Sequence, residues 1–375
     1  MNWLAGKFEL TRGGDAANVR PMEGLRGYAV FLVFLVHYVT LVEPWISSET
    51  RTMEIADGLR AIGNSGVDLF FVLSGYLIYG SLIRRRQAYS RFIYRRIERI
   101  YPTFVVVFLF YICLSFLFRR ESKIPVEFAD AALYLAQNFL LLPGLFPIEP
   151  MITVAWSLSY EMFYYLIIPV AIEGLRLRER RPFWRISFFV FVVVLAAVYC
   201  AAYGGHIRLI MFIAGILLHE AIACTEKLSG YFDFVGAAAM VVGIMGGLFP
   251  IDGSASYTTK IGILFIAFFF LCLTCFLRPS GWLARMFCWT PMRWLGNMSY
   301  SYYLIHGVAL KVAFSMLAVL VPVAVYGPWL FWLLLPLMFL VTLVPSGVLF
   351  VAIERTYSLS AVSGRGESKD ARVGA

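Results

Sequence analysis

The sequence has few charged residues: Asp, Glu, Lys and Arg occupy only 15% of its 375 positions, whereas soluble domains carry about 25%. Hydrophobic residues make up 61% of the chain, and the mean hydropathy is +0.77. Polar side chains are therefore too sparse to cover the apolar surface in water. This scarcity excludes a soluble enzyme and a disordered protein, and it predicts an all-α integral membrane protein.

Cysteine is scarce as well, with six residues in the chain. Cys272 and Cys275 form a C-x-x-C pair, but the pair lies in an apolar stretch without a second pair or a nearby histidine. We interpret both as packing residues and expect no metal site. A signal peptide is not expected either, because the first 26 residues are polar and lack an apolar core.

Long apolar runs are abundant. A membrane-spanning helix needs about 20 mostly apolar residues, and a polytopic bundle of about ten transmembrane helices is expected. The stretch 131–142 is too short to span and is interpreted as an interfacial helix or a re-entrant segment. The candidate spans are 27–43, 64–83, 100–118, 152–172, 183–203, 207–222, 234–250, 260–277, 296–320 and 327–353.

The basic residues predict the orientation. With these spans, 24 of the 32 Lys and Arg residues fall on one side, which the positive-inside rule assigns to the cytoplasm. Both termini are then cytoplasmic. We expect a cytoplasmic segment over 1–26, a transmembrane domain over 27–353 and a disordered cytoplasmic tail over 354–375. The net charge of +9 thus reflects topology and contact with membrane lipids, and no nucleic acid partner is expected.

Seven of the arginines fall within residues 84–99. Positive-inside anchoring and contact with anionic lipid head groups are one interpretation. Binding of a phosphorylated ligand on the cytoplasmic face is the other. Both stay open at this level.

Titratable residues inside spans are costly, and they are therefore the first candidates for a functional site. They are His37, Asp68, Glu161, His306 and Lys311.

His37 follows Arg26 by eleven residues, which is close to three helical turns and places both on one helix face. Glu161 enters its span from the opposite end and reaches a similar depth. A histidine near a carboxylate suits a general base, so we expect Glu161 to orient His37. The alternative is that both only join helices through polar contacts.

The remaining candidates are less specific. Asp68 is expected one turn inside the external end of the second span, and the Ser74-Gly75 pair predicts close helix packing, with Ser74 as a nucleophile the alternative. His306 is either functional or a hydrogen-bonded structural histidine. Lys311 either extends its amine to the membrane surface or pairs with an interior carboxylate.

Five blocks give the chain a specific resemblance. Over about residues 20–355 it is similar to the membrane-bound acyltransferase 3 family, integral membrane enzymes that acylate bacterial surface glycans. The blocks are MEGLRGYAVFLVFLVH at 22–37, GVDLFFVLSGYLI at 66–78, RRIERIYP at 95–102, WSLSYEMFYYLIIP at 156–169 and WLGNMSYSYYLIHG at 294–307.

The resemblance implies that His37 is the catalytic base or a transient acyl carrier, with Arg26 required beside it. It implies that Arg96 and Arg99, with Arg95 adjoining, bind phosphates of acyl-coenzyme A, the donor substrate. Asp68, Ser74, Gly75 and Glu161 match family positions whose individual roles are open. The chain resembles the members that lack a C-terminal hydrolase-like domain.

The expected function is O-acyl transfer in the bacterial inner membrane, with acetyl as the first choice of acyl group. The acceptor would be a hydroxyl of a cell-surface or lipid-linked glycan, such as an exopolysaccharide or lipopolysaccharide. The alternative is a transporter or channel in which His37, Glu161 and Lys311 form an intramembrane relay. The oligomeric state is not predicted.

Overall fold

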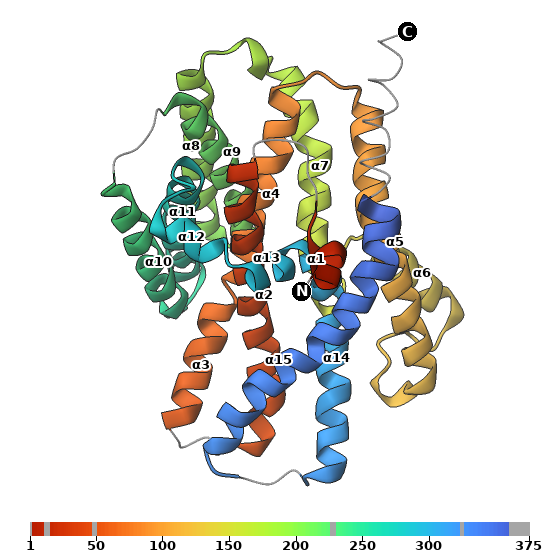
Figure 1. Cartoon of the computed structure of the whole chain (residues 1–375). Coiled ribbons are helices and arrows are strands. Elements are labelled where there is room, and N and C mark those ends of the chain that lie inside the picture. The colour runs from red at the N-terminus through yellow and green to blue at the C-terminus, as the bar shows by residue number, and fades with distance from the viewer. Residues whose placement is uncertain (1, 11–15, 47–50, 226–229, 323–325, 360–375) are drawn as a thin grey trace.

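The computed structural model describes residues 2–10, 16–46, 51–225, 230–322 and 326–359, and these parts are helical without any β-strand (Figure 1). Short 3-10 turns join several of the helices. The helices are α1 (Asn2–Phe8), α2 (Ala16–Val42), α3 (Arg51–Gly63), α4 (Gly66–Ile83), α5 (Tyr89–Leu117), α6 (Phe128–Phe139), α7 (Trp156–Gly174), α8 (Pro182–Tyr203), α9 (Ile210–Cys224), α10 (Phe232–Leu248), α11 (Ser254–Leu277), α12 (Trp282–Phe287), α13 (Thr290–Asn297), α14 (Ser299–Leu320), α15 (Trp329–Leu349) and the π-helix η6 (Phe350–Leu359).

The expected polytopic helical bundle is confirmed. Nine helical stretches among the described residues are long and apolar enough to cross a membrane, and α10, with 17 residues, is a shorter apolar helix in the position of the tenth expected span. Most of the stretch 131–142 lies in the short helix α6, Phe128–Phe139, which is too short to span, as expected. Helix α8 shows the membrane character most clearly, because its outward-facing side chains are large and apolar, namely Val190, Phe191, Val194, Leu195, Val198 and Tyr199.

Several expected boundaries differ from the structure; α2, for example, begins at Ala16, eleven residues before the expected first span. The second span begins at Arg51, because α3 continues into α4 with a break at Asn64 and Ser65. Asp68 therefore lies in the middle of this run of 33 residues rather than near its end. Helix α5 begins at Tyr89, eleven residues before the expected span, since arginines are compatible with a helix that extends beyond the apolar layer.

The C-terminal boundary also lies later than expected. Helix α15 runs directly into η6, which ends at Leu359, so the first six residues of the expected tail are helical. Glu354 within η6 is fully buried. Residues 360–375 lie outside the described part of the chain.

Glycines set the close approach of the central helices. A Cβ atom on Gly75 of α4 would lie 2.1 Å from the carbonyl oxygen of Phe212 on α9, and one on Gly215 would lie 2.1 Å from the carbonyl oxygen of Val72. Small residues permit this backbone contact, as is typical of membrane helices. Helix α2 is central to the other half of the molecule and packs against α3, α4, α13 and α14.

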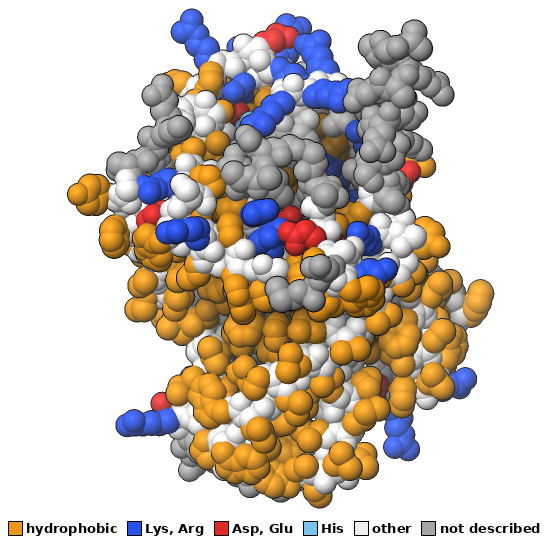
Figure 2. Space-filling view, in the orientation of Figure 1, with side chains coloured by type: hydrophobic (Ala, Val, Ile, Leu, Met, Phe, Trp, Pro, Cys, Tyr) orange, Lys and Arg blue, Asp and Glu red, His pale blue; other side chains and the backbone are white. Residues whose placement is uncertain are grey.

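Charge is distributed unevenly over the surface. Figure 2 shows Lys and Arg side chains gathered over the upper half of the view, at the ends of α4, α7 and α8 and near α12 and α13. The lower half, over α3, α14 and α15, is mainly hydrophobic. This pattern is the structural counterpart of the loop asymmetry in the sequence; the cytoplasmic location of the termini stays a prediction.

Candidate active site

Helix α2 carries the first pair of predicted site residues. It is unbroken from Ala16 to Val42, so Arg26 and His37 share a face but lie about 16 Å apart along the helix axis. They therefore occupy different levels of the bundle and are not neighbours. His37 is half-buried.

His37 lines a cavity of about 550 Å³ between α2, α5 and α14. The lining includes residues near the C-terminal ends of these three helices, such as Leu41 of α2 and Val319 of α14, and residues of the segments that follow α5 and precede α7, such as Glu121 and Met151. Leu304 and Gly307, in the N-terminal half of α14, line the cavity as well. Because α2 and α5 carry their arginines near their N-terminal ends, the cavity opens toward the opposite end of the molecule. Apolar walls with a single histidine at depth are typical of a small-molecule site.

Lys311 lies at the mouth of this cavity. It forms an ion pair with Glu121, and more than half of each side chain is exposed. The amine is thus solvated and paired at the surface, as one of the two interpretations of Lys311 predicted.

His306 on α14 lies beside His37. Their ring centroids are 4.9 Å apart, and the ring planes are inclined by 70°. His306 is fully buried, and its Nδ1–H donates to the carbonyl oxygens of Tyr302 at 2.9 Å and Tyr303 at 3.0 Å. The structure thus brings together two histidines that are 269 positions apart in the sequence.

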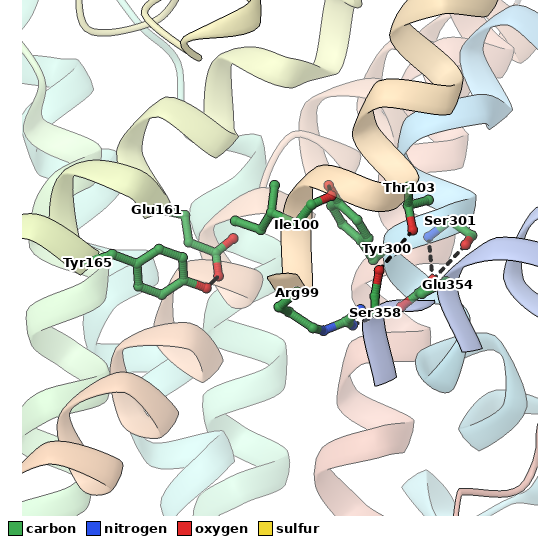
Figure 3. A network of polar contacts seen from close by, with 9 residues as sticks. All are labelled: Arg99, Ile100, Thr103, Glu161, Tyr165, Tyr300, Ser301, Glu354 and Ser358. Carbon is green, nitrogen blue, oxygen red and sulfur yellow. Dashed lines mark hydrogen bonds and ion pairs between the residues drawn. The ribbon is translucent and has the colours of Figure 1, made fainter. Parts of the chain in front are cut away.

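The second part of the site is a polar network around Arg99 (Figure 3). Its guanidinium pairs with the fully buried Glu354 at 2.8 Å and lies over the ring of Tyr300, 5.4 Å from the ring centroid. Glu354 also accepts hydrogen bonds from the backbone nitrogen of Ser301 at 3.0 Å and from its hydroxyl at 2.6 Å. Because Ser301 lies in the first turn of α14, Glu354 satisfies a backbone donor that the helix itself leaves unpaired.

Arg96 lies one turn before Arg99 and has a different environment. Its guanidinium lies over the rings of Phe92 and Tyr165, at 4.9 Å and 5.1 Å from their centroids. Among the described residues it donates one hydrogen bond, to Ser81, which is long at 3.5 Å. No ion pair joins Arg96 to a carboxylate among the described residues, so its charge is available to an anionic ligand.

Arg95 does not join this pair. Its side chain is exposed, because consecutive helical residues point about 100° apart. Of the three arginines of the predicted site, Arg96 and Arg99 are half-buried and Arg95 is exposed; their role in binding stays a prediction.

Glu161 is not placed to orient His37. Its carboxylate accepts hydrogen bonds from the hydroxyl of Tyr165 at 2.5 Å and from Ser74 at 3.4 Å, on the side of the arginine network (Figure 3). The expected pairing was wrong because equal depth in the membrane does not place two side chains on facing helix surfaces. In the described structure the neighbour of His37 is His306.

Asp68 belongs to a third buried group. It is fully buried and pairs with Arg208, whose Nε lies 3.5 Å from its Oδ1. Arg208 in turn lies over the ring of Trp156. Gly75 is a packing residue, as predicted, because Phe212 occupies the space of its missing side chain.

Two functional candidates were missed from the sequence. Glu354 lies at the end of the last span and was assigned to the tail, and Arg208 was counted with the external loops. The available signal was that Arg99 and Asp68 each require a buried partner of opposite charge, since charges inside a membrane are paired. The sequence could not say which residue supplies it.

The fold and the site define a multi-pass membrane protein with a histidine cavity opening at one end and a buried arginine network toward the other. The family described as "Acyltransferase domain" matches residues 21–351, most of the chain. The chain therefore belongs to the acyltransferase 3 family.

Two curated relatives are similar to the chain. O-acetyltransferase OatA of Staphylococcus aureus is 26% identical over 318 residues, which cover 76% of this chain and 49% of the relative. The putative O-acetyltransferase SACOL0978 of the same species is 24% identical over 329 residues, covering 78% of this chain and 51% of the relative. The chain thus spans about half the length of these relatives. No solved structure matches it.

Proposed function

We propose that the protein is an O-acyltransferase that moves a short acyl group, acetyl in the first instance, from acyl-coenzyme A to a hydroxyl of a surface or lipid-linked glycan. The observation that carries this proposal is the position of His37. It lies at the inner end of a cavity that opens away from Arg96 and Arg99. Donor and acceptor can therefore approach one histidine from opposite ends of the bundle.

The donor end would use the two arginines. Guanidinium groups suit the phosphates of coenzyme A, and Arg96 is the one without a carboxylate partner among the described contacts. On α5, Arg99 precedes the cavity residue Tyr111 by twelve residues, about 18 Å along the helix axis. The donor therefore needs a long arm, and the pantetheine arm of coenzyme A meets that need. We assign this end to the cytoplasm of a bacterial inner membrane, with both termini on that side.

The chemistry assigned to His37 is general base catalysis. The hydroxyl proton passes to a ring nitrogen of His37, the hydroxyl oxygen forms an ester bond with the acyl carbon, and the carbon–sulfur bond breaks. The thiolate then takes up a proton to leave as free coenzyme A. A covalent acyl-histidine intermediate is the second route, and it would allow the donor to leave before the acceptor arrives.

The alternative of a transporter relay has less support. Lys311 is paired with Glu121 at the exposed mouth, and Glu161 is directed to Tyr165 and Ser74. The three residues of that hypothesis therefore form no continuous chain among the described contacts.

The test uses the purified protein in proteoliposomes with labelled acetyl-coenzyme A and a glycan acceptor. We expect ester formation that is lost in His37→Ala and weakened in Arg96→Ala by a rise in donor KM. A Gly307→Leu variant should raise the acceptor KM, because Gly307 lines the cavity and has open space beside it. Gly262→Leu is the matched control, since Gly262 has equally open space and does not line the cavity.

Placing the substrates on opposite sides of the membrane tests the approach from two ends, and trapping of the acyl group separates general base catalysis from the covalent route. Donor and acceptor enclosed on opposite sides of the vesicle membrane should still react. Labelled acyl group trapped on the protein, and absent in His37→Ala, would support the covalent route. The proposed function would be overturned if the rate of donor consumption were the same with and without the acceptor and the same in His37→Ala as in the parent protein. Mass spectrometry of surface glycans with and without the gene would then identify the acyl group and its position.

A further inference from the structure

His306 is a buried histidine with one unused nitrogen. The side chain is fully buried, and Nε2 has no hydrogen-bond partner among the described residues. Buried polar atoms are nearly always paired, so an unpaired one requires an explanation. A purely structural histidine at this position would be expected to use both nitrogens.

The environment of His306 fixes its tautomer. Nδ1 lies 2.9 Å and 3.0 Å from two carbonyl oxygens, those of Tyr302 and Tyr303. Carbonyl oxygens only accept hydrogen bonds, so Nδ1 carries the proton and Nε2 is left as an acceptor. The ring of Tyr302 stacks on the imidazole at 5.1 Å with an inclination of 13°, which holds the ring in place.

The neighbour that can use this acceptor is His37. With centroids 4.9 Å apart, a nitrogen of one ring can approach a nitrogen of the other to hydrogen-bonding distance. His37 lines the cavity and His306 does not. His306 therefore lies behind His37 as seen from the cavity.

We infer that His306 is a positioning residue for the reaction proposed above: during the reaction the ring of His37 turns so that Nε2 of His306 accepts a hydrogen bond from one ring nitrogen of His37, which leaves the other nitrogen of His37 unprotonated toward the cavity. The inference rests on the proposed function. It assigns to a second histidine the orienting role that a carboxylate plays in a catalytic triad.

This arrangement accounts for the movement of one proton. When His37 takes the hydroxyl proton, both of its nitrogens carry hydrogen, and the hydrogen bond to Nε2 of His306 stabilises the resulting cation. The proton then leaves with the thiolate, and His37 returns to its starting tautomer. His306 keeps its own Nδ1 proton throughout, because two carbonyl oxygens hold it.

The experiment compares His306→Ala and His306→Gln in the proteoliposome assay with the full chain. We expect kcat in His306→Ala to fall by about 10²- to 10⁴-fold, with the acceptor KM within about twofold of the parent value. The Gln amide keeps an acceptor, so His306→Gln should recover at least about tenfold. Added imidazole should also restore part of the rate in His306→Ala.

Thr342→Val is the matched control. Thr342 is fully buried beside the same ring stack, where its hydroxyl bonds to that of Tyr302 at 2.8 Å. This variant removes the hydrogen bond to Tyr302 and keeps the shape of the side chain, so the stacked ring and both histidines stay in place. Its rate should stay within about twofold of the parent protein.

Three results would overturn the inference. They are a parent-like kcat in His306→Ala, equal losses in the Ala and Gln variants with no rescue by imidazole, or an equal loss in Thr342→Val. If His306→Ala does not fold, the comparison is between the kcat of His306→Gln and that of Thr342→Val: a lower kcat in His306→Gln supports the inference, and equal values overturn it. A parent protein that transfers acyl groups while His306→Gln and His306→Ala are unimpaired refutes this inference alone. A parent protein without transfer refutes the proposed function.

Discussion

The Arg99–Glu354 pair allows a stability prediction that can be worked from its contacts. Glu354 is fully buried and accepts bonds from Arg99 at 2.8 Å and from Ser301 at 2.6 Å and 3.0 Å. In Arg99→Ala the carboxylate keeps the bonds from Ser301 but loses its counter-charge. Removing one partner of a buried ion pair costs about 3–5 kcal/mol, and we expect the free energy of unfolding to fall by that amount.

The double variant Arg99→Ala/Glu354→Gln should be more stable than the single one. Gln keeps an oxygen that can accept the bonds from Ser301 and carries no charge, so the cost of the unpaired carboxylate disappears. The remaining loss is that of one ordinary hydrogen bond, about 1 kcal/mol. Thermal unfolding in detergent at a fixed scan rate ranks the stability of the three proteins: the parent should unfold at the highest temperature, the double variant next and Arg99→Ala at the lowest.

Arg95→Ala is the control for this series, because Arg95 lies on the same helix and its side chain is exposed. Its stability should stay within about 0.5 kcal/mol of the parent value. If the single and double variants unfold at the same temperature, or if Arg99→Ala loses no more than Arg95→Ala, the reasoning about the buried pair is refuted.

Three further predictions concern other parts of the molecule. Gly75→Ala should destabilise by about 1–3 kcal/mol, because its Cβ would lie 2.1 Å from the backbone oxygen of Phe212; thermal unfolding measures this. Burial alone would raise the pKa of Glu9, but hydrogen bonds from a tryptophan and from Arg293 outweigh it and lower the pKa. Glu9→Gln should therefore cost stability of less than about 1 kcal/mol at pH 7. The difference from the parent should shrink as the pH falls below the ordinary pKa of a glutamate and vanish as it passes through the lowered pKa of Glu9. Glu161→Gln should alter the donor KM and leave the shape of the pH–rate profile unchanged, since Glu161 lies with the arginine network.

Each of these has a control or a contrary outcome. Gly262→Ala, in a helix with open space around the new methyl group, should not destabilise; equal effects at both glycines would contradict the packing argument. A Glu9→Gln difference that persists unchanged in acid would show that charge is not its cause. A displaced pH–rate profile in Glu161→Gln would return Glu161 to the role of orienting His37.

The sequence by itself determined the class of the protein. Its scarcity of charge and its long apolar runs require a helical membrane bundle, because the bilayer core leaves no other way to satisfy the backbone of this chain. The five sequence blocks pointed to the family, and the few titratable residues inside spans included both histidines of the site. The sequence did not determine the exact number of spans, since α10, at one of the ten expected positions, falls just short of spanning length.

Only the tertiary structure decided which of these residues meet. Sequence spacing gives depth along one helix, but the partner of a side chain depends on how helices are arranged and rotated against each other. His37 thus faces His306 rather than Glu161, and Arg99 meets Glu354 across 255 positions of the chain. These contacts are long-range, and packing of helix against helix creates them.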